Sequence, residues 1–340
     1  MRVAMYYNNN DVKIEEMPTP DINDDEVLTK VIACGICGSD VMEWYRIKRA
    51  PLVLGHEIAG EIVKIGKNVD KYKIGDRVVV SHHVPCNTCH YCLHDHHTAC
   101  ETLRITNIYP GGFSEYIRVP KINVDRGVFL LPDEITYYQA TFVEPLACVL
   151  RSHKIAKIKP AQSVLIIGAG ISGLLHVKLA RALGAGVIYA SDVNVDRLKK
   201  AKECGANAAI DAHLDISDEL RRIHKKLVDV VIVATGAPSA FTQALKCVDR
   251  GGMIVFFASP NPEVETPMKI FDLWKDDITL ISSYAASPYE IETIIELLRN
   301  KVIKVDDMIT DILPLSETKK GFTLVSDAKK SMKVIIEPQK

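Results

Sequence analysis

A short apolar segment that runs directly into three closely spaced glycines constrains the fold of this chain most strongly. Residues 163–167 (Ser-Val-Leu-Ile-Ile) have the character of a buried strand, and Gly168, Gly170 and Gly173 follow in a G-x-G-x-x-G spacing. A helical pattern continues over residues 174–183. A strand that ends in such a turn and opens a helix is the context that a dinucleotide-binding motif needs. The segment therefore predicts an α/β domain of the Rossmann type.

Strand-like and helical segments alternate beyond this turn, at the spacing typical of a parallel sheet. Strands are expected at residues 186–190, 208–210, 229–234 and 253–257, and helices at residues 195–204 and 289–300. The strand at 253–257 is the candidate sheet edge for pairing between two copies of the chain. The first part of the chain instead carries many short β segments separated by turns, which predicts an all-β body. We therefore expect a nucleotide-binding domain at residues 151–287, inserted into a domain formed by residues 1–150 and 288–340.

The glycine turn and the end of the second strand supply the candidate cofactor site. The glycines allow a tight bend and close approach of the backbone to a pyrophosphate, and the helix N-terminus attracts the phosphates. The residues assigned to this contact are Gly168, Gly170, Ile171, Ser172 and Gly173. Asp192 ends the second strand, where a carboxylate binds ribose hydroxyls and repels a 2′-phosphate, so NAD is favoured over NADP. Arg197 could flank the adenosine and slightly weakens this preference.

Four of the nine cysteines, Cys86, Cys89, Cys92 and Cys100, lie within one short segment. Two-residue spacers let four thiolates surround one Zn²⁺ tetrahedrally and leave no position open for substrate, which predicts a structural zinc site. An iron–sulfur cluster is the alternative for such thiols. Nearby histidines could compete as ligands, but four thiols already complete the tetrahedron; these are His90, His94, His96 and His97.

A second set of metal-ligating residue types is spread along the first domain. Cys37, His56 with Glu57, and Glu144 offer thiolate, imidazole and carboxylate, the ligands of a catalytic zinc that keeps one position open. Zinc lowers the pKa of a bound alcohol, so that an alkoxide forms near neutral pH and expels hydride to a nicotinamide. The Ser39 hydroxyl is a candidate for relaying the proton of the alcohol. Asp40 is a candidate acceptor that orients a metal ligand.

In these motifs the chain resembles the zinc-containing medium-chain dehydrogenases, and within them the sorbitol/polyol dehydrogenase branch. The matching motifs, in the family's order, are residues 35–40, 55–60, 112–116 and 144–146, the four-cysteine lobe and the glycine fingerprint. The resemblance implies a GroES-like β domain joined to a Rossmann domain, an active site between them, and homodimers or homotetramers. It also implies that Cys37 and His56 are zinc ligands and that Glu144 replaces the third-ligand cysteine of simple alcohol dehydrogenases. Whether Glu57 or Glu144 contacts the metal at rest is left open.

Three positions depart from the pattern of the relatives. Met42 stands where many relatives carry the histidine that ends the proton relay, so the relay must end differently, through ribose and water or through Glu43. Glu43 and Ser283 stand where sorbitol dehydrogenases carry a tyrosine and an arginine associated with polyol binding. The resemblance therefore predicts the chemistry and does not predict sorbitol as the substrate.

Composition excludes several other classes of function. The 340 residues carry a net charge of -1, with no basic excess for nucleic acid or an anionic membrane. The apolar runs are far shorter than the roughly 20 residues that span a bilayer, and the first residues do not resemble a signal peptide, so we expect a cytoplasmic protein. The expected activity is NAD-dependent oxidation of a secondary alcohol in a polyol, cyclitol or sugar.

Alternative functions share parts of the same pattern. L-threonine 3-dehydrogenases share the cysteine lobe and the Gly-His-Glu motif, and an anchor for the substrate carboxylate would favour them; Arg46, Lys48 and Arg49 are candidates. A zinc-independent NADPH reductase of the quinone oxidoreductase type shares the fold but not the metal ligands. A nucleotide-binding protein without catalytic activity would be expected to lose those ligands or Ser39.

Overall fold

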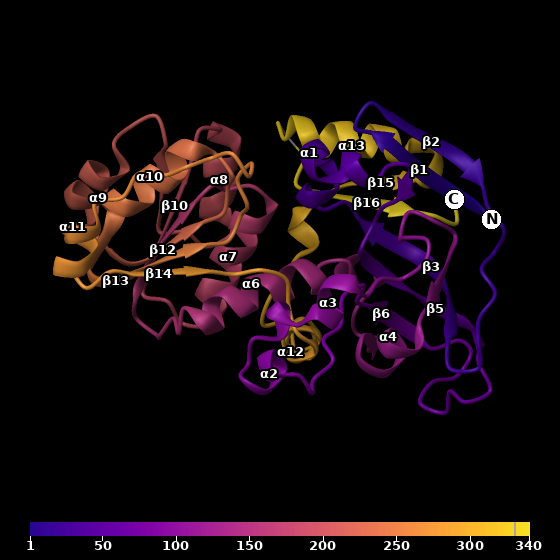
Figure 1. The fold of residues 1–340 in the computed structure, drawn as a ribbon. Coiled ribbons are helices and arrows are strands. Elements are labelled where there is room, and N and C mark those ends of the chain that lie inside the picture. Colours follow the sequence, from indigo (N-terminus) through magenta and orange to yellow (C-terminus); the bar gives the residue numbers. More distant parts are fainter. Residues whose placement is uncertain (330) are drawn as a thin grey trace. The chain divides into compact units, whose positions relative to one another are not determined.

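The structure is a computed structural model that describes residues 1–329 and 331–340 (Figure 1). It forms two compact units, one made of Met1–Ala147 with Ala286–Lys340 and the other of Cys148–Ala285. Helix α6 (Val143–Ile155) contains the first boundary between them. The predicted α/β class, with one β-rich unit and one unit built on a parallel sheet, is confirmed. Among the described residues, no helix combines the length and apolar character needed to cross a bilayer.

The first unit is built on two sheets. Its strands are β1 (Arg2–Asn8), β2 (Asp11–Glu16), β3 (Val27–Gly35), β4 (Leu52–Val53), β5 (Glu57–Ile65), β6 (Arg77–Val80), β7 (Tyr116–Val119), β8 (Val128–Leu130), β15 (Ile309–Pro314) and β16 (Lys333–Glu337). The larger sheet has the order β15-β16-β3-β5-β6-β8, with β7 also paired to β3, and the smaller one has the order β2-β1-β4. Gly35 at the end of β3 lies opposite Glu57 at the start of β5 and next to Ile335 of β16. The C-terminal segment thus adds a strand beside the loop that follows β3.

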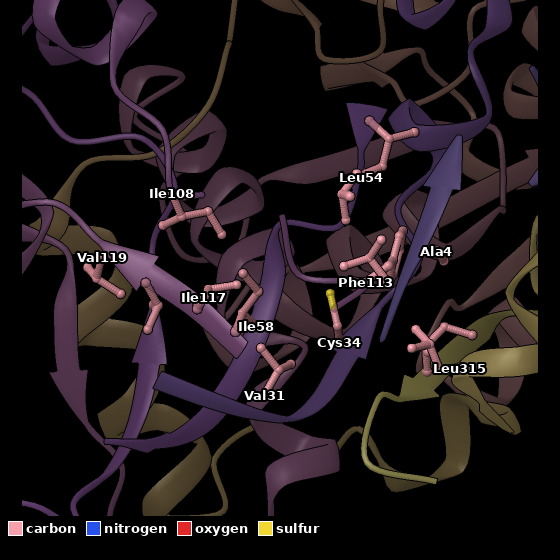
Figure 2. Close-up of a cluster of buried hydrophobic side chains, with 14 of the residues drawn as sticks. Ala4, Val31, Cys34, Leu54, Ile58, Ile108, Phe113, Ile117, Val119 and Leu315 are labelled. Atoms are coloured by element: carbon pink, nitrogen blue, oxygen red, sulfur yellow. The ribbon is translucent and has the colours of Figure 1, made fainter. Parts of the chain in front are cut away.

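Short helices connect these strands. They are η1 (Gly38–Val41), α1 (Glu43–Arg46), η2 (Ile47–Arg49), α2 (His90–Leu93), η3 (His97–Ala99), α3 (Glu101–Ile105), α4 (Lys121–Arg126), α5 (Tyr137–Ala140), α12 (Pro288–Arg299), η4 (Asp306–Met308), η5 (Leu315–Glu317) and α13 (Thr318–Asp327). The hydrophobic core of the first unit is formed largely by alternate apolar residues of its strands. Figure 2 shows that the side chain of Cys34 lies in this core, near Val31, Ile58 and Phe113. Burial raises the pKa of the Cys34 thiol, so this cysteine is a packing residue.

The second unit is a parallel sheet with the strand order β11-β10-β9-β12-β13-β14. Its strands are β9 (Ser163–Ile167), β10 (Val187–Asp192), β11 (Ala208–Asp211), β12 (Val228–Val233), β13 (Val248–Phe256) and β14 (Thr279–Ser282), and its helices are α7 (Ile171–Ala182), α8 (Val195–Glu203), α9 (Ile216–His224), α10 (Pro238–Cys247) and α11 (Ile270–Lys275). The order reverses between β9 and β12, and ligands of such sheets bind at the carboxyl ends of the strands on either side of this point. The glycine turn follows β9 and therefore lies at the position that such ligands occupy.

The edge of this sheet differs from the prediction. Residues 253–257 were expected to form an edge strand, and this is wrong, because β13 pairs with β12 on one side and with β14 on the other. The edge strand beyond β13 is β14, which has only four residues and follows a charged segment. So short a strand gives almost no alternation that a sequence pattern can reveal.

Candidate metal and coenzyme sites

The loop after β3 holds the first candidate metal ligand in a turn fixed by its own side chains. Cys37 caps η1, and its Sγ accepts a hydrogen bond from the backbone N–H of Ser39 at 3.4 Å. The Oδ2 of Asp40 accepts one from the backbone N–H of Cys37 at 3.0 Å. Asp40 is fully buried, so the turn that carries Cys37 is anchored from the inside of the domain.

Asp40 also orients His56. The Nδ1 of His56 lies 3.3 Å from Oδ1 of Asp40, which leaves Nε2 as the nitrogen that can bind a metal. Burial disfavours the charged imidazole, but the charge and hydrogen bond of Asp40 outweigh it and raise the pKa of His56. Burial likewise disfavours the carboxylate, yet His56 and Arg46 lower the pKa of Asp40. This pairing is the arrangement in which a carboxylate behind a histidine fixes its ring for metal binding.

Cys37, His56 and Glu57 form a ligand group whose donor atoms all lie within 4.8 Å of one another. A thiolate, an imidazole and a carboxylate match the donor set of a catalytic zinc with an open position, so these residues fit the metal. Glu144 lies half-buried in the first turn of α6 and is not part of this group. The structure therefore brings together three of the four residues predicted for the catalytic metal.

A buried cation that the sequence analysis missed contacts Glu57. The Nζ of Lys333, on β16, donates hydrogen bonds to Oε2 of Glu57 and to the backbone oxygen of Thr141, the latter at 3.1 Å. Both charged side chains are almost fully buried. A Cβ on Gly35 would lie 2.1 Å from Oε2 of Glu57 and 2.5 Å from Nζ of Lys333, so a larger residue here would displace the ends of both side chains. Lys333 and Glu57 are 276 residues apart, and no local pattern links them.

Ser39 has a second partner that the sequence did not identify as part of the site. The guanidinium of Arg46 donates to the Ser39 hydroxyl at 3.1 Å and to the Ser39 backbone oxygen at 2.9 Å. It also lies 3.6 Å from Asp40. Arg46 thus connects the proposed relay hydroxyl with the carboxylate behind His56, while Met42, at the position of the missing relay histidine, separates η1 from α1.

The four-cysteine lobe has the geometry of a second metal site. The sulfur atoms of Cys86, Cys89, Cys92 and Cys100 lie within 4.8 Å of one another. Backbone N–H groups of Thr88 and Cys89 donate to Sγ of Cys86, and the first of them contributes most to lowering the pKa of this thiol to about 5. A thiolate is the form that binds zinc, and these hydrogen bonds favour that form at Cys86. Burial and the neighbouring Cys89 instead raise the pKa of Cys92 to about 12. The four histidines of the lobe are outside this ligand group.

The glycine turn and Asp192 lie together in the second unit. Gly168 has a φ of +96°, and a Cβ on Gly173 would lie 1.8 Å from the Gly168 oxygen, so both positions require glycine. Gly170 caps α7, whose first residues are Ile171 and Ser172.

Asp192 joins this turn to the end of β10. Its Oδ2 accepts a hydrogen bond from the backbone N–H of Ala169 at 2.7 Å, and its Oδ1 accepts one from Asn194 at 2.9 Å. Arg197 approaches the same carboxylate, with 3.7 Å between Nη1 and Oδ2. The five turn residues, Asp192 and Arg197 are thus adjacent, as a single dinucleotide site requires.

Comparison with known proteins covers both units. Residues 23–133 match the family model of the alcohol dehydrogenase GroES-like domain, and residues 172–300 match that of zinc-binding dehydrogenases. The chain is 33% identical to sorbitol dehydrogenase of Bacillus subtilis (strain 168), over 100% of this chain and 98% of that protein. It is 33% identical to L-threonine 3-dehydrogenase of Bacillus velezensis, over 92% of this chain and 91% of that protein.

The likeness extends to solved structures. The crystal structure of galactitol-1-phosphate dehydrogenase from Escherichia coli matches with a TM-score of 0.87 and 26% identity, over 99% of this chain and 100% of that chain. Two family models and full-length relatives above 30% identity agree with the ligand group and the glycine turn. The predicted resemblance is confirmed, and the chain belongs to the zinc-dependent medium-chain alcohol dehydrogenase family.

Proposed function

We propose that this dehydrogenase oxidises a secondary alcohol of a polyol, cyclitol or sugar to a ketone, with NAD as the hydride acceptor and zinc at Cys37, His56 and a carboxylate. The observation that carries the proposal is the ligand group of Cys37, His56 and Glu57, with Asp40 behind the histidine. The identity with sorbitol dehydrogenase supports the substrate class. Glu144, half-buried on α6, is proposed as the carboxylate that exchanges with Glu57 at the metal.

The residues of the site divide the work of the reaction. When bound, zinc polarises the alcohol oxygen and the nicotinamide accepts the hydride. Asp40 keeps Nε2 of His56 directed at the metal by holding Nδ1. The Ser39 hydroxyl would accept the proton of the alcohol and pass its own hydrogen on, through the coenzyme ribose and water or through Glu43. Because Arg46 donates to Ser39 Oγ, that hydrogen is free to point toward such an acceptor. Lys333 holds Glu57 at the edge of the ligand group.

The preference for NAD rests on Asp192. Its carboxylate is held by two backbone N–H groups beside the glycine turn. A carboxylate at the end of this strand would accept ribose hydroxyls and repel a 2′-phosphate. Gly168, Gly170, Ile171, Ser172 and Gly173 would hold the pyrophosphate. Arg197, close to Asp192, would flank the adenosine. A second zinc at Cys86, Cys89, Cys92 and Cys100 would have a structural role only, because its four ligands leave no open position.

A second candidate is L-threonine 3-dehydrogenase activity. The 33% identity with an enzyme of that name supports it. Arg46, which donates to the Ser39 hydroxyl, offers an anchor for the substrate carboxylate. A zinc-independent quinone reductase is disfavoured, because the complete ligand group and the cysteine lobe would then have no role.

A substrate panel separates these functions. Sugar alcohols, their phosphates, cyclitols, simple alcohols and L-threonine would each be incubated with NAD or NADP, and reduced-coenzyme absorbance followed before chelation, after it, and after zinc is returned. We expect NAD-dependent turnover that is lost on chelation and restored by zinc. Turnover only with NADPH and indifferent to zinc would contradict the roles given to Cys37, His56 and Asp192. Turnover of L-threonine alone would select the second candidate.

We also propose that the protein is a homodimer or homotetramer paired through β14. This strand is an unpaired sheet edge, and the neighbouring α11 exposes Ile270, Phe271 and Trp274, the last with 76% of its surface accessible. Sedimentation at micromolar concentration is expected to give at least twice the mass of the chain, and Trp274→Glu is expected to shift it toward the monomer. A monomeric wild-type protein would rule out this assembly. A cytoplasmic location fits a zinc–thiolate lobe, because reducing compartments preserve thiolate ligands.

A further inference from the structure

Two guanidinium groups flank one aromatic ring, and the nearer of them contacts the proposed relay hydroxyl. Tyr45 carries two guanidinium groups near its ring, with Arg46 at 4.8 Å and Arg49 at 5.8 Å from the ring centre. Arg46 in turn donates to the Ser39 hydroxyl at 3.1 Å, and Ser39 donates its backbone N–H to Cys37 Sγ at 3.4 Å. The Arg46 guanidinium is therefore linked through Ser39 to Cys37, a proposed ligand of the metal.

Histidines from the segment after β6 extend this arrangement. The rings of His56 and His82 lie 4.8 Å apart, and those of His82 and His83 lie 3.8 Å apart, so the three rings form a row that starts at the metal ligand. Burial, followed by the positive charges of His56, Arg46 and Arg49, lowers the pKa of His83 to about 4. His83 is thus a neutral hydrogen-bonding group two rings removed from His56, and both guanidinium groups are near enough for their charges to act on it. We call Arg46, Arg49 and His83 the basic cluster.

Few carboxylates compensate the basic cluster. Asp40 is fully buried and is already paired with His56, Arg46 and the Cys37 backbone. Glu43 accepts a hydrogen bond from the backbone N–H of Asn9 at 2.9 Å and so has a partner in another segment. Within residues 1–329 and 331–340, neither Lys48 nor Arg49 lies in an ion pair with a carboxylate. Arg46 is balanced by Asp40, so the positive charge without a carboxylate partner in the described residues is that of Lys48 and Arg49.

We propose that the substrate carries an anionic group, a phosphate ester or a carboxylate, which binds to Arg46, Arg49 and His83. Guanidinium groups form paired, charge-assisted hydrogen bonds with phosphate and carboxylate, and a neutral polyol makes no comparable use of them. The ammonium group of L-threonine would be repelled by the same charges, so an acidic polyol fits the cluster better than an amino acid does. This inference rests on the proposed function, because it takes the alcohol to react beside Ser39.

The test compares matched substrates on the zinc-loaded enzyme with NAD. The pairs are sorbitol with sorbitol 6-phosphate and galactitol with galactitol 1-phosphate, and gluconate provides the carboxylate arm. We expect kcat/KM to be about 100-fold higher for the anionic member of a pair, as one or two charge-assisted hydrogen bonds would give. Preference for the phosphates over gluconate, or the reverse, would identify the anion. Equal or better turnover of the neutral polyols would overturn the inference.

Variants test whether the basic cluster causes the preference. In Arg49→Gln, the kcat/KM for the anionic substrate divided by that for its neutral partner is expected to fall tenfold or more. The main cause should be a higher KM for the anionic substrate. Lys67→Gln is the matched control, because it removes an exposed cation that pairs with Asp24 elsewhere in the same unit, and it should keep the ratio. An unchanged ratio in Arg49→Gln, or the same loss in Lys67→Gln, would contradict the assignment.

A binding measurement keeps the inference separate from the proposed function. Inorganic phosphate would be titrated calorimetrically into the zinc-loaded wild type and Arg49→Gln. Phosphate binding that Arg49→Gln weakens at least tenfold would support the basic cluster even if every alcohol of the panel fails, in which case the proposed function alone would be wrong. Equal binding to both proteins would overturn the cluster whatever the enzyme oxidises.

Discussion

Replacing Cys37 by serine is expected to remove half of the bound zinc and to lower kcat/KM by about three orders of magnitude. A serine hydroxyl is a poor zinc ligand, and loss of a Lewis acid worth several kcal/mol corresponds to a rate decrease of about this size. Zinc content measured on the purified protein would separate the two metal sites, because the four thiols of the lobe remain in Cys37→Ser.

Cys204→Ala is the control for Cys37→Ser. It also removes a thiol, but from the end of α8 in the other unit, outside both ligand groups of the described chain. Zinc content and kcat/KM should remain close to those of the wild type. A Cys37→Ser protein that retains all its zinc and its rate would show that the catalytic metal is held elsewhere.

Gly35→Ala is expected to destabilise the protein by about 1–3 kcal/mol, the usual cost of adding volume to a packed interior. The new Cβ would lie 2.1 Å from Oε2 of Glu57 and 2.5 Å from Nζ of Lys333, which forces the buried pair apart. The free energy of unfolding would be measured in urea. Gly38→Ala, three residues further on, is the matched control, because nothing lies within 4 Å of the Cβ it adds.

A charge test shows whether the cost comes from the ion pair or from steric strain alone. Lys333→Met leaves Glu57 buried without its cation and should cost about 3–5 kcal/mol, whereas Glu57→Gln combined with Lys333→Met should recover part of that stability. Equal stability of Gly35→Ala and Gly38→Ala would contradict the assigned role of the Gly35 position. A Lys333→Met protein as stable as the wild type would contradict the importance of the pair.

The local arrangements that the sequence predicts and the structure contains are those encoded within a few residues of the chain. Gly168, Gly170 and Gly173 stand between a strand and a helix that are contiguous with them, so their spacing alone defines the turn. The four thiols of the lobe are likewise close in sequence, and the structure brings their sulfur atoms within 4.8 Å of one another. Residues so close in sequence are held close in space by the backbone itself, independently of the rest of the fold.

The features missed depend on pairing between distant segments. The approach of Lys333 to Glu57 follows from the placement of β16 beside β3, a register that no local pattern specifies. The sheet edge was assigned to residues 253–257 because the four residues of β14 are too few to be recognised. The contact of Arg46 with Ser39 was hidden because a basic run usually indicates a solvated surface. Tertiary packing determines all three features, and no local pattern in a single sequence indicates which distant segments will pack together.

The separation of Glu57 from Lys333 has a consequence for biosynthesis. At about 5–20 residues per second, the ribosome needs roughly 14–55 s to synthesise the 276 residues between them. Throughout that time the nascent chain already contains Cys37, His56 and Glu57, while the cation and the strand that carries it do not yet exist. A metal ion bound during translation would therefore meet Glu57 before this carboxylate has paired with Lys333. The positive charge of Lys333 would be added to the site only after the three ligands are present.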